Sequence, residues 1–100
     1  MKIIENAKGF AKPKLVEKYG KNGTDINIFK NTEIDEYGST LFIYDIYRFE
    51  NETFENDIVA LIRIKYSVSD ELAILRQRDS KVEAFNEYYD YVEWCKKQFE

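Results

Sequence analysis

Histidine is missing from this chain of 100 residues, and cysteine occurs only once, as Cys95. Histidine is the most common general base at neutral pH and the most common ligand of transition metals in proteins. Without it, a Ser–His or Cys–His nucleophile pair cannot be built, and a zinc site loses its usual ligands. A single cysteine also excludes a disulfide within the chain. We therefore expect a protein that is not an enzyme and that carries no metal and no cofactor.

Long apolar runs are missing as well. Met1 to Glu5 are followed by lysines and polar residues, which is unlike the apolar core of a signal peptide. No segment has the length of apolar sequence that a membrane-spanning helix requires. The sequence thus predicts a protein without a membrane partner, in a reducing cytosol or in a particle assembled there.

Proline and glycine are scarce and unevenly placed. The single proline is Pro13, the four glycines all lie within the first 40 residues, and residues 41–100 contain neither. Because these residues punctuate strands and turns and interrupt helices, the pattern predicts strands first and helices afterwards.

Aromatic residues, in contrast, are abundant, at 16% of a chain whose hydrophobic content is 44%. Large aromatic side chains bury more area than small ones, so even a short chain can build a core from them. A chain of this length has room for one such core. We expect a single domain over residues 1–100, with residues 1–10 as a flexible terminus, the default state of a chain end.

Three segments of the first half have the β-branched and aromatic composition of strands. Asn22-Gly23, between the first two, favours the positive φ angles of a tight turn, and a polar loop separates the second from the third. The predicted strands span residues 14–19, 25–34 and 40–49. The simplest arrangement is a three-stranded antiparallel β-meander over about residues 12–49.

The second half repeats apolar residues at spacings of three and four, as on one face of an α-helix. Thr53 and Ser69 are placed as N-caps of the first two helices, and Ser80 with Glu83 has the pattern of a capping box before the third. The predicted helices span about residues 54–66, 69–78 and 81–99. The sequence therefore predicts an α+β fold, a meander followed by three α-helices.

Asp45 is an acidic residue within the most apolar strand, on the face shared with Ile43 and Tyr47. A carboxylate there needs a partner if it is buried. The favoured interpretation is a hydrogen bond or ion pair with a helix residue such as Arg76 or Arg78, and the alternative is a role at an interface.

Aromatic residues occupy more than one side of the last predicted helix. Tyr88, Tyr91 and Trp94 are candidates for contact with another protein, because tyrosine and tryptophan are favoured at interfaces. A sheet that covers more of this helix would account for them equally well. Cys95 lies in the stripe expected to pack inward, where it is a small core residue rather than a reactive thiol.

Arg76-Gln77-Arg78-Asp79-Ser80 is a dense polar run between two predicted helices. Arg76 and Arg78 are the remaining interaction candidates, with an anion as one conceivable ligand. A helix end followed by a capping turn explains the run equally well. The turn at residues 20–23 lacks the spacing of a phosphate-binding loop.

The net charge of −4 is unevenly distributed. Residues 1–23 carry six lysines against two glutamates, whereas residues 24–100 carry nine basic and seventeen acidic side chains. A basic start on an acidic body allows contact with nucleic acid or with an acidic protein surface. The favoured interpretation is simpler, that lysines protect a solvated edge strand from pairing with other chains.

Several stretches resemble small uncharacterised proteins of bacteriophages and prophages. The resemblance is carried by Asp57 to Arg63, Glu71 to Ser80 and Phe85 to Glu93, by the strand segment Ile43 to Tyr47, and by the opening Gly9 to Lys14. It covers most of the chain but contains no chemical motif, and no catalytic residues carry over. Val82 stands where those proteins usually have a proline, so a rigid helix start is lost without consequence for function.

The resemblance implies a function, because the phage genes in question tend to lie among tail and baseplate genes. We expect a tail-associated structural, accessory or assembly protein that acts through protein–protein contacts. Its partners would be phage tail components and further copies of itself, and its location the host bacterial cytoplasm or the virion. Nucleic acid is not the expected partner. The alternative is a small phage regulator or anti-defence protein that binds nucleic acid or mimics it.

Overall fold

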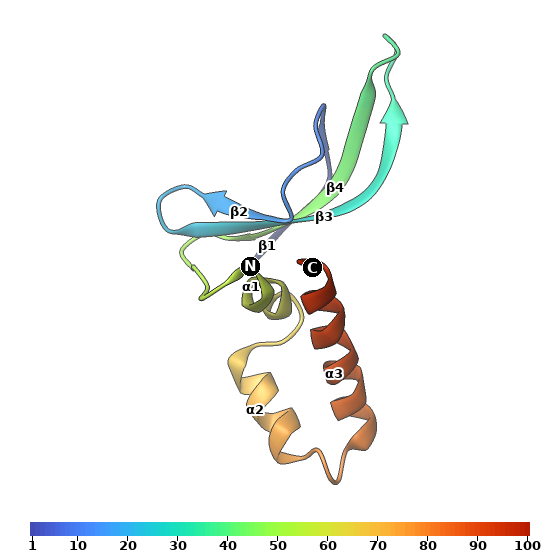
Figure 1. Cartoon of the computed structure of the whole chain (residues 1–100). Coiled ribbons are helices and arrows are strands. Elements are labelled where there is room, and N and C mark those ends of the chain that lie inside the picture. Colours follow the sequence, from blue (N-terminus) through green and yellow to red (C-terminus); the bar gives the residue numbers. More distant parts are fainter. The chain divides into compact units, whose positions relative to one another are not determined.

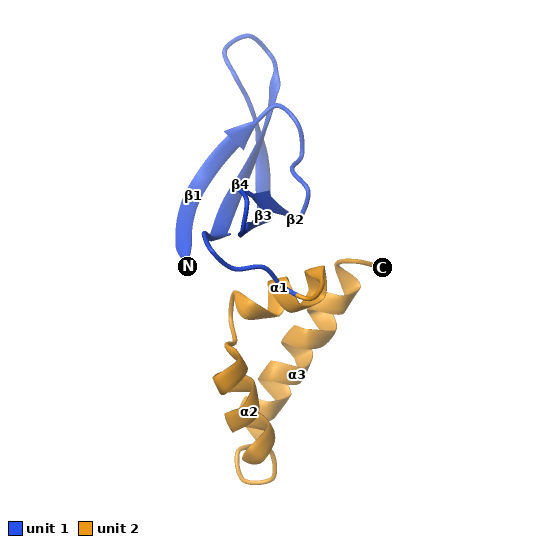
Figure 2. Cartoon of the chain, turned by 90° about the vertical axis from the view of Figure 1, so that its left-hand side faces the viewer, with its two compact units in different colours: residues 1–54 blue, residues 55–100 orange.

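The structure is a computed structural model that describes all residues, 1–100. The chain divides into two compact units, residues 1–54 and residues 55–100 (Figure 2). The first unit contains every strand and the second every helix (Figure 1). The predicted α+β class is thereby confirmed. That residues 1–100 behave as one domain stays a prediction.

The sheet unit is an antiparallel sheet of four strands in the order β1-β4-β3-β2. The strands are β1 (Lys2–Gly9), β2 (Val16–Tyr19), β3 (Gly23–Ile34) and β4 (Thr40–Phe49). The meander β2-β3-β4 is the one predicted from sequence. The predicted number of three strands is wrong, because Lys2–Gly9, expected to be a flexible terminus, pairs with the free edge of β4. That pairing joins residues far apart in sequence, so local composition does not reveal it.

Asp45 on β4 is placed between two irregularities of the sheet. The register of β1 shifts between Ile4 and Ala7, and that of β3 shifts between Phe29 and Asn31. In the first shift Asn6 has a positive φ of 55°, and its backbone N–H donates to Asp45 Oδ1 at 3.0 Å. In the second shift Lys30 places its Nζ 3.7 Å from the same oxygen.

The expected pairing of Asp45 with Arg76 or Arg78 is therefore wrong. A bulge leaves backbone N–H and C=O groups without a partner on the neighbouring strand. The Asp45 carboxylate accepts a hydrogen bond from one such N–H, that of Asn6, and also pairs with Lys30. The partners come from within the sheet itself.

A buried ion pair lies beside the buried apolar residues of the sheet. Ile26 and Ile43 are buried, and so is the carboxylate of Asp25, which pairs with Arg48 at 2.8 and 2.9 Å. The Arg48 guanidinium also lies 3.7 Å over the ring of Tyr19. A planar guanidinium can make both contacts at once, and the hydrogen bond with Asp25 raises the pKa of Arg48.

The helical unit contains three helices, all shorter than predicted, and turn residues follow the end of each. They are α1 (Asp57–Arg63), α2 (Val68–Arg76) and α3 (Val82–Lys97). None of them combines the length and apolar character that a membrane crossing requires. Their buried core consists of residues from α1 and α3 only: Ala60, Leu61, Ile62 and Cys95.

The three predicted caps are corrected by the structure. Asn56, rather than Thr53, caps α1 by accepting from the N–H of Val59 at 2.9 Å. Ser67, rather than Ser69, caps α2 and forms a capping box with Asp70. Both sequence choices lay within three residues of the true cap, where several polar residues compete for the same role.

The third predicted cap, the capping box of Ser80 and Glu83, does not form. Lys81 occupies the N-cap position of α3 without a side-chain hydrogen bond. The Ser80 hydroxyl donates to the carbonyl oxygen of Gln77 at 3.2 Å instead. It thereby satisfies the end of α2 rather than the start of α3.

Candidate interaction surface

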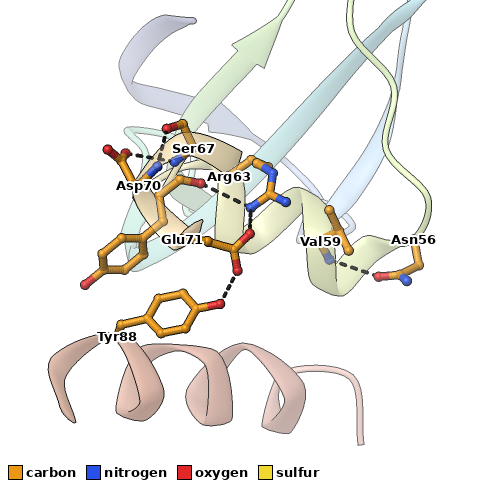
Figure 3. A network of polar contacts seen from close by, with 8 residues as sticks. Asn56, Val59, Arg63, Ser67, Asp70, Glu71 and Tyr88 are labelled. Atoms are coloured by element: carbon orange, nitrogen blue, oxygen red, sulfur yellow. Dashed lines mark hydrogen bonds and ion pairs between the residues drawn. The ribbon is translucent and has the colours of Figure 1, made fainter. Parts of the chain in front are cut away.

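One carboxylate joins the three helices. Glu71 on α2 accepts hydrogen bonds from the guanidinium of Arg63 on α1 and from the hydroxyl of Tyr88 on α3 (Figure 3). The same nitrogen of Arg63 lies 3.3 Å from the carbonyl oxygen of Tyr66 in the turn between α1 and α2. These contacts fix α2 beside α3 through polar groups rather than through an apolar core.

The tyrosines around this network are held in the neutral form. Burial, followed by the hydrogen bond to Glu71 and its negative charge, raises the pKa of Tyr88 to about 12. Burial also raises the pKa of Tyr66, whose ring packs edge-on against Tyr88 with centroids 5.1 Å apart. A neutral phenol that donates to a carboxylate serves as a structural contact at ordinary pH.

Tyr91 and Trp94 form a second aromatic group on α3. The Tyr91 hydroxyl donates to the carbonyl oxygen of Leu61 at 2.6 Å, and its ring stacks on Trp94 with centroids 5.7 Å apart. Trp94 remains 43% exposed. Of the three aromatic interaction candidates, Tyr88 and Tyr91 thus use their hydroxyls within the helical unit, and Trp94 presents the largest exposed ring surface.

Arg76 and Arg78 lie at the end of α2 and in the turn that follows it, and both side chains are exposed. Tyr91 and Trp94 lie in the second half of α3, whereas the turn that contains Arg78 leads into the start of that helix. The five candidates therefore do not converge on one site. Their role in contacts with other molecules stays a prediction.

The apolar side of α2 is exposed, although α2 has no buried residue at all. Three of its apolar side chains, Val68, Leu72 and Leu75, are 57%, 49% and 42% exposed. Their spacing of four and three places them on one side of the helix. We call these three residues the α2 row.

A matching group lies near the start of α3. Val82 and Tyr89 are 54% and 53% exposed, and Phe85, between them in sequence, packs against Tyr89 with ring centroids 6.3 Å apart. We call Val82, Phe85 and Tyr89 the α3 row. The two rows concentrate large exposed apolar residues on adjacent helices, and such patches on soluble domains mark sites of interaction.

Sequence reasoning missed these rows. The predicted second helix began at residue 69 and so left out Val68, and apolar periodicity does not distinguish a covered face from an open one. The open side of α2, a helix of nine residues of which none is buried, depends on which distant segments reach it and has no local sequence signal.

No group of three or more His, Cys, Asp or Glu side chains is arranged to hold a metal ion. Burial raises the pKa of the Cys95 thiol, which suits a core residue. In the sheet unit the side-chain amide of Asn27 donates to Lys14 and Glu17, while its buried Oδ1 has no protein partner.

Comparison with known proteins yields no relative. No protein-family model matches the chain, and comparisons with curated proteins and with solved structures give no match either.

Proposed function

We propose that this protein is a structural or assembly component that acts by binding another protein chain through its helical unit. The observation that carries the proposal is α2, a helix with no buried residue and an exposed apolar row. A nine-residue helix gains little stability from its own hydrogen bonds. Another chain that covers the α2 row would remove its apolar side chains from water and so stabilise the helix.

The setting that we propose is the tail of a bacteriophage or prophage. It is supported by the resemblance of residues 57–63, 71–80 and 85–93 to small phage proteins, and it fits a chain without histidine. In this setting the protein is found in the host cytoplasm during assembly or in the virion afterwards, and it performs no catalysis.

The test is to locate the protein in a phage-producing strain. Particles and tail-assembly intermediates would be purified and their proteins quantified by mass spectrometry, with an abundant host protein as the control for carry-over. We expect a fixed number of copies per particle or per intermediate, and defective tails when the gene is deleted. Absence from both fractions would contradict the tail role.

A variant pair links this test to the surface. Leu72→Glu places a charge in the α2 row, where Leu72 is 49% exposed, whereas Ile34→Glu places the same charge on an apolar residue of the sheet unit that is 67% exposed. We expect Leu72→Glu to reduce incorporation and Ile34→Glu to leave it unchanged. Equal incorporation of the two variants would show that the α2 row is not the binding surface.

The alternative, binding or mimicry of nucleic acid, is less well supported by the contacts of the lysine-rich segment. Lys8 pairs with Glu33 at 3.4 Å, and Lys12 lies 4.8 Å over the ring of Phe29. Direct binding would show affinity for DNA or RNA that falls steeply as salt is added. No binding at low salt would remove direct binding, whereas a mimic would compete with nucleic acid for a DNA-binding protein.

A further inference from the structure

Few side chains attach helix α2 to the rest of the helical unit. Of its nine residues, Val68–Arg76, only Glu71 and Ile74 are half-buried, and the other seven are exposed. The buried core of the unit comes instead from α1 and α3, which are also joined by the hydrogen bond of the Tyr91 hydroxyl to the carbonyl oxygen of Leu61. The position of α2 therefore depends mainly on the contacts of Glu71 and Ile74.

The polar part of this attachment is concentrated on one carboxylate. Glu71 accepts hydrogen bonds from Arg63 on α1 and from Tyr88 on α3 (Figure 3). The side chains of Glu71 and Arg63 are each only 18% exposed, and hydrogen bonds to a charged group are stronger than those between neutral groups. The capping box of Ser67 and Asp70, in contrast, joins residues at the start of α2 to each other. We call the hydrogen bonds of Glu71 to Arg63 and Tyr88 the Glu71 latch.

A detached α2 would not remain helical. Isolated helices shorter than about 12–15 residues are at best marginally stable in water, and α2 has nine residues. Residues 64–67 and 77–81, on either side of it, are not helical. The segment can therefore open without breaking the backbone hydrogen bonds of α1 or α3, and its detachment and its unfolding are a single local event.

We propose that α2 opens as a separate segment of the helical unit and that the Glu71 latch keeps it closed. Regions with few buried apolar contacts open at a lower free energy than the core of the same protein. Opening also abolishes the α2 row, because Val68, Leu72 and Leu75 share one side only while the segment is a helix. The latch thus controls whether the α2 row is available, and a chain that binds the row draws the equilibrium towards the closed state.

The experiment is native-state hydrogen exchange of the whole purified chain, followed amide by amide by NMR. The amides of residues 72–76, within α2, are compared with those of residues 86–94, within α3. We expect protection factors in α2 to be at least about tenfold lower than in α3, because α2 exchanges through local opening and α3 through unfolding of the core. Exchange in α2 should also respond only weakly to added urea, since local opening exposes little surface.

Two tyrosine variants test the latch. Tyr88→Phe removes one bond of the Glu71 latch from the α3 side and leaves the sequence of α2 unchanged, so the protection factors of α2 should fall about threefold or more. Tyr89→Phe removes the hydroxyl of the next residue, which is 53% exposed, and should leave them unchanged. Circular dichroism reports whether both variants keep their helices.

A core variant tests whether α2 opens separately. Cys95→Ala weakens the buried core shared by α1 and α3, which stays intact when α2 alone opens. We expect the protection factors of residues 86–94 to fall about threefold or more, and those of α2 to keep the values of the natural chain. If α2 opened only when the whole unit unfolds, both sets would fall together.

Three results would overturn the inference: α2 amides as well protected as those of α3, a Tyr88→Phe variant no different from Tyr89→Phe, or an equal effect of Cys95→Ala on α2 and α3. Each is measured on the free protein and does not depend on the proposed function. A well-protected α2 in a protein that is found in phage particles would overturn the local opening and leave the tail role standing. An α2 that opens as expected, in a protein absent from particles and intermediates, would support the inference and remove the tail role.

Discussion

Tyr88 on α3 donates its hydroxyl hydrogen bond to the carboxylate of Glu71 on α2, and Arg63 on α1 donates to the same carboxylate. One side chain thus links α2 to both of the other helices of the unit. Because α2 contributes nothing to the buried core, its position depends on this carboxylate to an unusual degree. The same arrangement leaves the α2 row open to another chain.

Glu71→Ala is expected to lower the free energy of unfolding of the helical unit by about 1–3 kcal/mol, because two half-buried donors lose their acceptor. Tyr88→Phe, which removes one of the two hydrogen bonds, should cost less. Urea denaturation followed by circular dichroism measures both. If the double variant costs as much as the two single variants added together, Glu71 and Tyr88 do not act as a pair.

Tyr88 should be a late-titrating tyrosine. Its pKa is raised to about 12, first by burial and then by the hydrogen bond and charge of Glu71. A tyrosine in the unfolded chain ionises near pH 10, so the stabilisation is complete below about pH 10 and is lost as pH rises through about 12. A near-ultraviolet absorbance titration should show a component near pH 12 that Tyr88→Phe removes. An unchanged titration curve in Tyr88→Phe would refute the assignment.

In the sheet unit, the ion pair of Arg48 with Asp25 should matter far more than that of Lys8 with Glu33. Arg48→Ala leaves the Asp25 carboxylate buried without its partner, which is expected to cost about 2–3 kcal/mol of unfolding free energy. Lys8 and Glu33 are largely exposed to solvent. Lys8→Ala should therefore cost less than about 0.5 kcal/mol. Thermal denaturation compares the two variants, and equal losses would mean that burial is not the deciding factor.

Gly23 at the start of β3 should tolerate no side chain. A Cβ there would lie 2.6 Å from the carbonyl oxygen of Tyr19 and 2.8 Å from that of Phe49, and both are backbone atoms that cannot move cheaply. Gly23→Ala is expected to destabilise the sheet by about 2 kcal/mol or more through this overpacking.

Gly9→Ala serves as the control for that prediction. A Cβ on Gly9 meets nothing closer than the Tyr44 hydroxyl oxygen at 3.5 Å, an ordinary contact distance. Its effect on unfolding should stay within about 0.5 kcal/mol. A cost at Gly9 similar to that at Gly23 would point to a general preference for glycine in these strands rather than to steric contact.

Much of the fold was predictable because its signals are local. The meander β2-β3-β4 follows from two polar turns between apolar segments, and the helices follow from spacings of three and four in a stretch without proline or glycine. The ends of the elements were less predictable. Thr53, Asn56, Ser67 and Ser69 are all good caps, and only the path of the backbone selects between them.

The candidate surface was predictable in part. The sequence indicated that α3 carries aromatic residues on more than one side, and Trp94 is indeed partly exposed. It did not indicate that the hydroxyls of Tyr88 and Tyr91 donate hydrogen bonds to Glu71 and to the carbonyl oxygen of Leu61, because hydrogen bonds between different helices have no sequence signature.

The sequence by itself determined the class of the fold, the division into strands and then helices, and the poor supply of catalytic and metal-binding side chains. These properties depend on composition and on residues close together in the chain. Only the tertiary structure decided that Lys2–Gly9 completes the sheet, that Asp45 pairs with Lys30, and that the apolar side of α2 is left open. Each of these depends on which segments, far apart in the sequence, pack against each other. The periodicity of apolar residues does not show which segments those are.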